Sequence, residues 1–138
     1  MPATEADDFL SSLPERVREA LTMALRYTER DWEFLEGEAW FREWAADREM
    51  RSPEQMHRDG VSKHQQADLS GELYDNEVHA DVRVTEHGTG VTLYVAHSSG
   101  IYLWLGPDAD FRVPGDVETC LDRAREASVL DAGGDDPE

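Results

Sequence analysis

The segment 77–105 shows the most regular alternation of hydrophobic and polar positions in the chain, in three runs separated by glycine-containing turns. Because successive side chains of a β-strand point to opposite faces of a sheet, this pattern predicts a three-strand antiparallel meander with one apolar face. A first loop at 88–89 would pair Val84 with Leu93, and apolar residues would then lie opposite one another. The second loop would pair Leu93 with Leu105 in the same way.

The N-terminal part of the domain predicts a helix followed by a hairpin. Apolar residues recur at helical spacing over 13–24, which indicates an amphipathic helix. Residues 25–35 fit either a continuation of this helix or a hairpin around a charged turn at 29–31. Aromatic and aliphatic residues alternate with polar ones on both sides of this turn, and this alternation favours the hairpin.

Three further segments are predicted to be helical, at 38–50, 52–69 and 115–130. The first of them places Trp40 and Trp44 on the same face, which we expect to point inward. The elements define an α+β fold of the order α-β-β-α-β-β-β-α. In this fold the hairpin and the meander form an antiparallel five-strand sheet flanked by helices.

The predicted domain spans residues 9–130. The segments 1–8 and 131–138 are acidic and have no hydrophobic period, so we expect them to be disordered. A single domain agrees with the length of 138 residues, because one hydrophobic core typically serves about 100 to 150 residues.

The element order resembles the roadblock/longin-like and profilin-like architecture, in which a five-strand antiparallel sheet carries helices on both faces. The runs LRYT at 25–28 and WEFL at 32–35, together with 72–84, are also similar to a family of small uncharacterised haloarchaeal proteins. The haloarchaeal resemblance implies no particular activity. The roadblock-like resemblance implies a dimerising or docking module without chemistry of its own.

The charge composition points to an unusual solvent. The chain has 31 acidic and 13 basic residues, for a net charge of −18, and Lys63 is its only lysine. At molar salt the Debye length is about 3 Å, so such an acidic surface is tolerated. This composition therefore indicates a halophilic protein. The negative charge also argues against nucleic acid and anionic membranes as partners.

The sequence offers few targeting or redox features. The N-terminal segment MPATEADDFL has neither a basic start nor an apolar core, so we expect a cytoplasmic location. Cys120 is the single cysteine and falls among apolar residues at helical spacing, which predicts a buried core residue. No pattern in the chain requires a cofactor, and we expect none.

The more polar face of the predicted meander carries the candidate interaction surface, which consists of Arg83, Tyr94, Tyr102 and Trp104. We expect these side chains to be covered either by a helix of this chain or by a partner, which would be a second copy or another protein. Alternatively, they would line the pocket of a small-ligand sensor.

A metal site is a weaker alternative on the same face. Glu77, His79 and Asp81 alternate along one predicted strand and therefore project the same way, as the ligands of a metal-dependent enzyme would. Polar alternation is also typical of any half-exposed strand, and carboxylates are frequent throughout this chain. We therefore expect no metal at this position.

A second candidate surface lies in the least acidic stretch of the domain, residues 48–66, which has four basic and three acidic residues. Its basic and titratable members form a candidate docking patch for an acidic partner: Arg48, Arg51, His57, Arg58, Lys63 and His64. The simpler interpretation is an exposed helix that carries intrahelical ion pairs.

Catalytic signatures are absent from the sequence, which contains no GxxxxGK[ST], GxSxG, HExxH or CxxC motif. We therefore expect a non-catalytic protein-interaction or regulatory module of a halophilic archaeon, working as a homodimer. A small-ligand sensor that uses the aromatic sheet face is the alternative.

Overall fold

The computed structural model describes residues 8–48, 53–97 and 99–126. A helical segment at 8–12 comes first. The elements that follow are α2 (Glu15–Ala20), β1 (Leu21–Tyr27), β2 (Trp32–Glu36), α3 (Glu38–Arg48), α4 (Pro53–Tyr74), β3 (Ala80–Thr85), β4 (Gly88–Ala96), β5 (Ser99–Leu105) and α5 (Gly115–Glu126). The five strands form one antiparallel sheet in the order β2-β1-β5-β4-β3, so the predicted α+β fold is confirmed.

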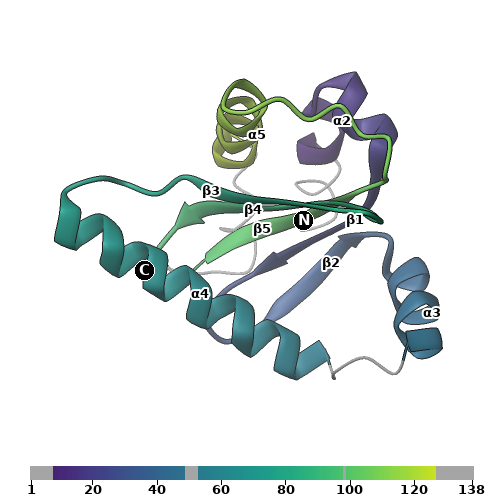
Figure 1. Ribbon diagram of the computed structural model, residues 1–138, viewed down its shortest axis with the longest axis horizontal. Helices are drawn as coiled ribbons and strands as arrows, with labels where there is room; N and C mark the ends of the chain where they lie inside the picture. Colours follow the sequence, from purple (N-terminus) through teal and green to yellow (C-terminus); the bar gives the residue numbers. More distant parts are fainter. Residues whose placement is uncertain (1–7, 49–52, 98, 127–138) are drawn as a thin grey trace.

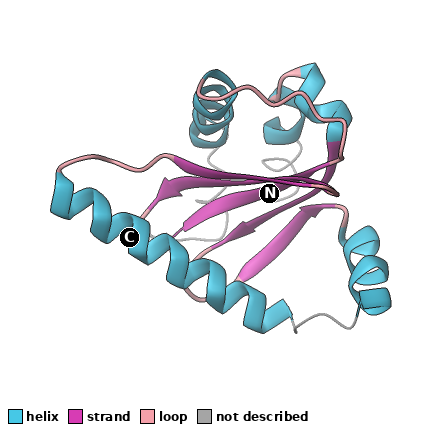
Figure 2. Ribbon diagram, in the orientation of Figure 1, coloured by secondary structure: helices cyan, strands magenta, loops and turns pink. Residues whose placement is uncertain are grey.

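Helices cover both faces of the sheet, which forms the middle of three layers (Figures 1 and 2). α2 and α5 lie on one face, and α3 and α4 lie on the other. The main hydrophobic core fills the space on the α2 and α5 side. Its buried side chains are Phe9, Leu13, Val17, Ala24, Val91, Leu93, Ile101, Leu103, Leu105, Val117, Cys120, Leu121 and Ala124.

The first strand begins earlier than predicted. The sequence indicated a helix over 13–24, but α2 ends at Ala20, and Leu21 is already extended with ψ at 121°. β1 lies between β2 and β5, so both of its edges are paired, and helices cover both faces of the sheet. A short apolar run such as 21–24 is equally compatible with a helix and with a strand that is buried on both faces. Its pairing with β5 makes this segment a strand.

The hairpin predicted over 25–35 is confirmed, with Leu25 opposite Phe34 and Tyr27 opposite Trp32. Its turn contains no glycine, and Thr28 takes over the stabilising role. The Thr28 hydroxyl accepts hydrogen bonds from the backbone N–H groups of Arg30 and Asp31, at 3.2 and 3.1 Å. Side-chain bonds of this kind hold a turn without a left-handed residue.

The meander is confirmed, but its register differs from the predicted one. The first turn lies two residues earlier than expected, so Leu93 pairs with Ala80 instead of Val84. On the other side, Leu93 pairs with Ile101 of β5 instead of Leu105. Both shifts are even in residue number. The side chains of β3, of β4 up to Leu93 and of β5 from Ile101 therefore keep their predicted faces, because side chains alternate with a period of two.

Gly88 accounts for the position of the first turn. Its φ is 155°, and a Cβ at this position would lie 2.4 Å from the carbonyl oxygen of Leu105 and 2.7 Å from the Trp104 ring. The Thr85 hydroxyl donates to the Gly88 carbonyl at 3.0 Å and accepts the N–H of His87 at 3.1 Å. The glycine is therefore required where β4 begins rather than inside the loop.

The remaining helices follow the prediction with changed ends. α4 runs to Tyr74 instead of ending near Leu69, and α5 buries Val117, Leu121 and Ala124 as expected. The predicted helix ends at residues 50 and 130 lie outside the described residues. The same holds for the segments predicted to be disordered, apart from Asp8, which is helical. Within the described residues, no helix is both long enough and apolar enough to cross a membrane.

Candidate functional site

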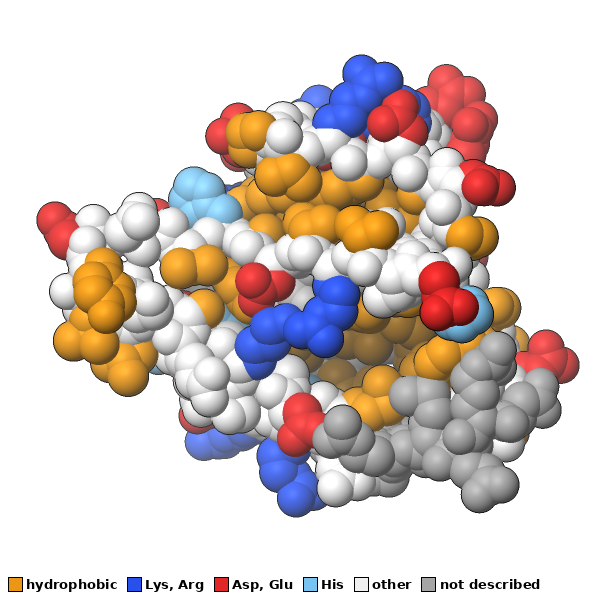
Figure 3. All heavy atoms as spheres, in the orientation of Figure 1, with side chains coloured by type: hydrophobic (Ala, Val, Ile, Leu, Met, Phe, Trp, Pro, Cys, Tyr) orange, Lys and Arg blue, Asp and Glu red, His pale blue; other side chains and the backbone are white. Residues whose placement is uncertain are grey.

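A pocket of about 390 Å³ lies between the sheet and the helices α3 and α4. We call it the sheet pocket. Its floor is formed by residues of all five strands, and its cover is formed by residues of α4 with Phe41 of α3. Figure 3 shows a hollow in this face whose visible interior is hydrophobic, with a basic side chain along its edge.

Two rows of paired residues cross the floor of the sheet pocket. Strand pairing sets the first row as Phe34, Leu25, Tyr102, Thr92 and Asp81. It sets the second row as Met23, Trp104, Gly90 and Arg83. The first row begins with apolar residues on β2 and β1 and the second with an apolar residue on β1, whereas both end at a charged residue on β3, so the pocket has an apolar end and a polar end.

Aromatic rings close the apolar end. The Trp32 and Phe34 rings of β2 meet edge to face with their centroids 5.4 Å apart, and the Phe41 ring of α3 lies 5.5 Å from that of Phe34. The first of these arrangements is favourable for aromatic pairs, because the positive edge of one ring meets the negative face of the other. These contacts attach α3 to the edge strand and give the pocket a rigid apolar wall.

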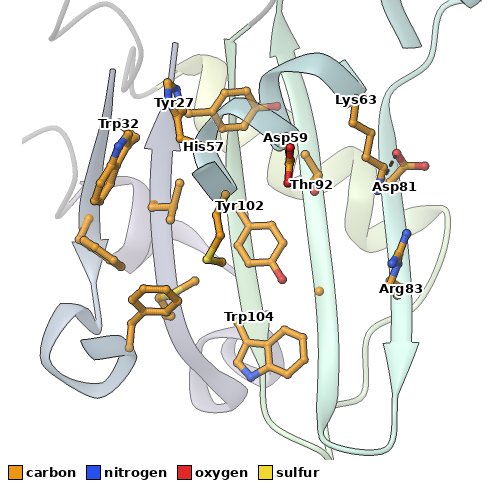
Figure 4. A pocket seen from close by; sticks show the side chains of 17 residues that line it. Tyr27, Trp32, His57, Asp59, Lys63, Asp81, Arg83, Thr92, Tyr102 and Trp104 are labelled. Atoms are coloured by element: carbon orange, nitrogen blue, oxygen red, sulfur yellow. Dashed lines mark ion pairs between the residues drawn. The ribbon is translucent and has the colours of Figure 1, made fainter. Parts of the chain in front are cut away.

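The polar end combines residues of α4 with residues of the sheet (Figure 4). The Lys63 ammonium lies 3.5 Å from the carboxylate of Asp81, which also accepts a hydrogen bond from the Tyr94 hydroxyl. The Nε2–H of His57 donates to the carbonyl oxygen of Thr28 at 2.8 Å. These groups are therefore occupied by partners within the protein, and they form no pair of a nucleophile with its base.

Three polar side chains at this end have no hydrogen-bond or ion-pair partner among the described residues: Arg83, Thr92 and Tyr102. Figure 4 shows the Tyr102 hydroxyl directed toward β4, on the side where Arg83 lies. Burial raises the pKa of Tyr102, and the positive charge of Arg83 opposes that rise. The positive charge of Arg83 therefore acts on the Tyr102 hydroxyl, and both side chains line the polar end of the sheet pocket.

Gly90 makes room for this hydroxyl. A Cβ at residue 90 would lie 2.6 Å from the Tyr102 hydroxyl oxygen. The missing side chain at Gly90 thus lets the Tyr102 hydroxyl lie over the floor between Trp104 and Arg83, the two neighbours of Gly90 in the second row. A glycine inside a strand often marks a place where another group must approach the backbone closely.

Beside the sheet pocket, α4 contacts the sheet through a buried histidine. His64 is fully buried, and its Nδ1 lies 2.6 Å from the Tyr27 hydroxyl oxygen. Its ring also packs on Tyr94, with the ring centroids 4.4 Å apart. Burial lowers the pKa of His64, whereas the Asp68 carboxylate and the Ala96 carbonyl oppose this shift.

The structure brings most of the predicted aromatic surface to the pocket. Arg83, Tyr102 and Trp104 line it, as the sensor alternative expected. Tyr94 is only 4% exposed because α4 lies over it. The covering element is thus a helix of this chain, and these four residues do not form a free, flat surface for a partner.

The predicted docking patch is divided between different environments. Lys63 and His57 line the sheet pocket, whereas Arg58 is exposed outside it. His64 was predicted on the surface but is buried, because α4 turns this side toward the sheet. Arg51 and the side chain of Arg48 lie outside the described residues.

The candidate metal ligands also separate. His79 lies 3.8 Å from the carboxylate of Glu77, while Asp81 is engaged by Tyr94 and Lys63. Within the described ranges, no cluster of three or more His, Cys, Asp or Glu side chains is arranged to hold a metal ion. Cys120 is buried in the core as predicted, and burial raises its thiol pKa to about 12.

The sequence prediction missed the apolar half of the pocket. Alternation along the hairpin already places Leu25, Tyr27, Trp32 and Phe34 on one face. The sequence prediction did not contain the pairing of β1 with β5, which puts Leu25 next to Tyr102.

No family model and no curated protein matches this chain.

Proposed function

We propose that this chain is a non-catalytic regulatory module that binds a small, largely apolar molecule in the sheet pocket. The supporting observation is the pocket itself, a cavity of about 390 Å³ with an apolar aromatic end and a few free polar groups at the other end. Ligand pockets of proteins typically have this combination and a volume of about 300 to 1,000 Å³.

Ligand sensing has more support here than an interface on the sheet face. α4 lies over Tyr94, so a macromolecular partner has no access to the centre of that face. A small molecule needs no such access, since the hollow is open to solvent in Figure 3. The pocket residues His57, Lys63 and Asp81, which could do acid-base chemistry, are engaged by other groups of the protein, and this supports binding rather than catalysis.

The first test uses the neutral probe para-butylbenzamide, which carries a ring and a short apolar tail. We expect saturable binding at one site in molar KCl, measured by calorimetry, together with a change in tryptophan fluorescence. Trp104 lines the pocket, whereas Trp40 is outside its lining. The fluorescence change should therefore persist in Trp40→Phe and shrink in Trp104→Phe. Lack of saturable binding up to the solubility limit of the probe would contradict the proposal.

A second candidate function is self-association through the C-terminal turns of α4. Leu69, Leu73 and Tyr74 are 55, 69 and 75% exposed there, and Figure 3 shows hydrophobic side chains gathered at this end of the molecule. Exposed apolar groups of this kind mark contact surfaces. A second copy of the chain is the favoured partner, because a two-fold axis lets one apolar patch cover itself.

Sedimentation equilibrium in molar KCl tests this second candidate. We expect a dimer for the wild type and a monomer for Leu73→Glu, because the substitution places a charge in the buried contact. Gln66→Glu adds the same charge to an exposed position of α4 and serves as the control. A wild-type protein that stays monomeric at high concentration would exclude the dimer and leave the ligand-binding proposal unchanged.

We further propose that the module works in the salt-rich cytoplasm of a halophilic archaeon. The net charge of −18 with a single lysine supports this setting, since high salt screens the repulsion between acidic groups.

A further inference from the structure

The free polar groups of the sheet pocket point to the charge of its ligand. The Arg83 guanidinium can only donate hydrogen bonds, while the hydroxyls of Tyr102 and Thr92 can donate or accept. The carboxylate of Asp81 is already engaged by Tyr94 and Lys63. Asp59 also has an interaction partner. Among the described residues, the unoccupied groups at this end are therefore rich in donors and contain no free carboxylate.

This excess of donors has a consequence for any molecule that fills the pocket. Covering Arg83 with an apolar or purely donating ligand would remove water from a charge without replacing its hydrogen bonds, which is unfavourable. A carboxylate supplies two acceptor oxygens in one plane and matches a guanidinium in charge and shape. It can also accept from the Tyr102 hydroxyl, which lies on the same side of the floor.

The two rows of the floor set the direction and the size of the part of the ligand that extends beyond its carboxylate. The row that ends at Asp81 passes through Thr92 and Tyr102 before it reaches Leu25 and Phe34. Neighbouring strands are about 4.8 Å apart, so β4 and β1 are separated by about 10 Å. This distance suits a ring and a short apolar tail attached to the carboxylate. The aromatic wall of Trp32, Phe34 and Phe41 then contacts the apolar part of the molecule.

The number of negative charges on the ligand is limited by the rest of the protein. With a net charge of −18, the protein as a whole repels anions, and Arg83 is the single unpaired cation among the described residues of the pocket. One charged head can be matched at this position, whereas a polyanion such as a nucleotide triphosphate would leave most of its charge unmatched.

Resting on the ligand-binding function proposed above, we infer that the ligand is an apolar, ring-containing molecule with a single carboxylate. Arg83 and Tyr102 hold the carboxylate at the β3 and β4 end, with Thr92 as a further donor. The ring and tail extend over Leu25 toward Phe34 and Phe41.

The first measurement compares para-butylbenzoate with para-butylbenzamide by calorimetry on the wild-type protein in molar KCl. The two probes have nearly the same shape and differ in charge. We expect the carboxylate to bind about tenfold more tightly, which corresponds to one charge-assisted hydrogen-bonding contact. Equal or tighter binding of the amide overturns the inferred ligand class and leaves the ligand-binding function standing. Binding of neither probe contradicts the ligand-binding function itself.

The second measurement locates the contact. Arg83→Gln should lower the affinity for para-butylbenzoate about tenfold and leave the affinity for para-butylbenzamide unchanged. Arg58→Gln makes the same change in charge at an exposed position of α4 outside the pocket and should affect neither probe. Equal losses of benzoate affinity in both variants would show a general charge effect and overturn the role of Arg83. Circular dichroism of each variant verifies that the fold is retained.

Discussion

The Tyr27 hydroxyl oxygen and the Nδ1 of His64 lie 2.6 Å apart, in a buried hydrogen bond that joins β1 to α4. A helix that packs on a sheet usually presents large apolar side chains to it, but the most buried residue of α4 is this histidine. The Nε2 of His64 has no hydrogen-bond partner within the described residues, although Asp68 Oδ1 is 3.6 Å away. The Tyr27–His64 pair is thus a buried polar contact of α4 with the sheet, beside the more exposed contacts of Lys63 and His57.

We predict that Tyr27→Phe destabilises the fold by about 1 to 3 kcal/mol, because it leaves a buried ring nitrogen without a partner. Urea unfolding at pH 8 in molar KCl measures this loss. Tyr102→Phe is the matched control. Its hydroxyl has no partner among the described residues, so we expect a change within about 0.5 kcal/mol. Equal losses in the two variants would mean that the Tyr27–His64 bond contributes little.

The pH dependence of stability should report the same histidine. Burial lowers the pKa of His64 below its ordinary value of 6.5, so the folded state disfavours the protonated ring. The stability that this group contributes is fully present above pH 6.5 and is lost as the pH falls through that value toward the lower folded-state pKa. The free energy of unfolding should therefore decrease between about pH 7.5 and 5.5, before most carboxylates titrate near pH 4.

His64→Gln tests the assignment of this slope, since glutamine cannot titrate but keeps a polar group near Tyr27. We expect the variant to be less stable at pH 7.5 and to show a shallower decrease over the same interval. Thermal unfolding of both proteins across the pH series provides the comparison. The same slope in wild type and variant would assign the pH dependence to other groups.

Sequence reasoning succeeded where structure depends on near neighbours. Alternation predicted that Arg83, Tyr102 and Trp104 share one face of the sheet. The structure places all three on that face, although both predicted registers of the meander were wrong. It succeeded because an even shift preserves the face of every side chain. The apolar half of the pocket depends on the pairing of Leu25 with Tyr102, a contact between distant parts of the chain that no local pattern encodes.

The orientation of α4 illustrates a second reason why the sequence did not predict part of the structure. Hydrophobicity alone would turn Leu69 and Leu73 inward and His64 outward, whereas the two leucines are exposed and the histidine is fully buried. Only part of α4 lies over the sheet, and its C-terminal turns project beyond the strands in Figure 1. The helix face that becomes buried is therefore chosen by the partners available at the sheet, which here are Tyr27 and Tyr94.

A second polar contact lies on the opposite face, between the half-exposed Arg16 of α2 and the buried Asp116 of α5. The Arg16 guanidinium donates two hydrogen bonds to the Asp116 carboxylate, at 2.8 and 3.1 Å, and the backbone N–H of Arg112 adds a third at 2.7 Å. The hydrogen bond from Arg16 is the largest influence that lowers the pKa of Asp116. The stability from this carboxylate is therefore present above its ordinary pKa of 3.8 and is lost below it.

We predict that Asp116→Asn costs about 1 to 3 kcal/mol, because it removes the charge from a contact in which the carboxylate is buried. Asp110→Asn is the control, since Asp110 pairs with Arg112 at an exposed position, where an ion pair contributes at most about 1 kcal/mol. Urea unfolding at neutral pH separates the two. A loss for Asp110→Asn as large as that for Asp116→Asn would contradict the importance of burial.

The acidic surface leads to a prediction about salt. Repulsion among the charges that make up the net −18 opposes the compact state, and dissolved ions screen this repulsion. We therefore expect the midpoint of thermal unfolding to fall as KCl decreases from molar concentration to about 0.1 M, where the Debye length grows to about 10 Å. The triple variant Glu72→Lys, Glu118→Lys, Asp122→Lys replaces three exposed negative charges by positive ones and should show a weaker salt dependence. Choline chloride at equal ionic strength should act like KCl if screening is the cause. A midpoint that stays constant in the wild type over this range of salt would rule out adaptation to a salt-rich cytoplasm as the reason for the acidity.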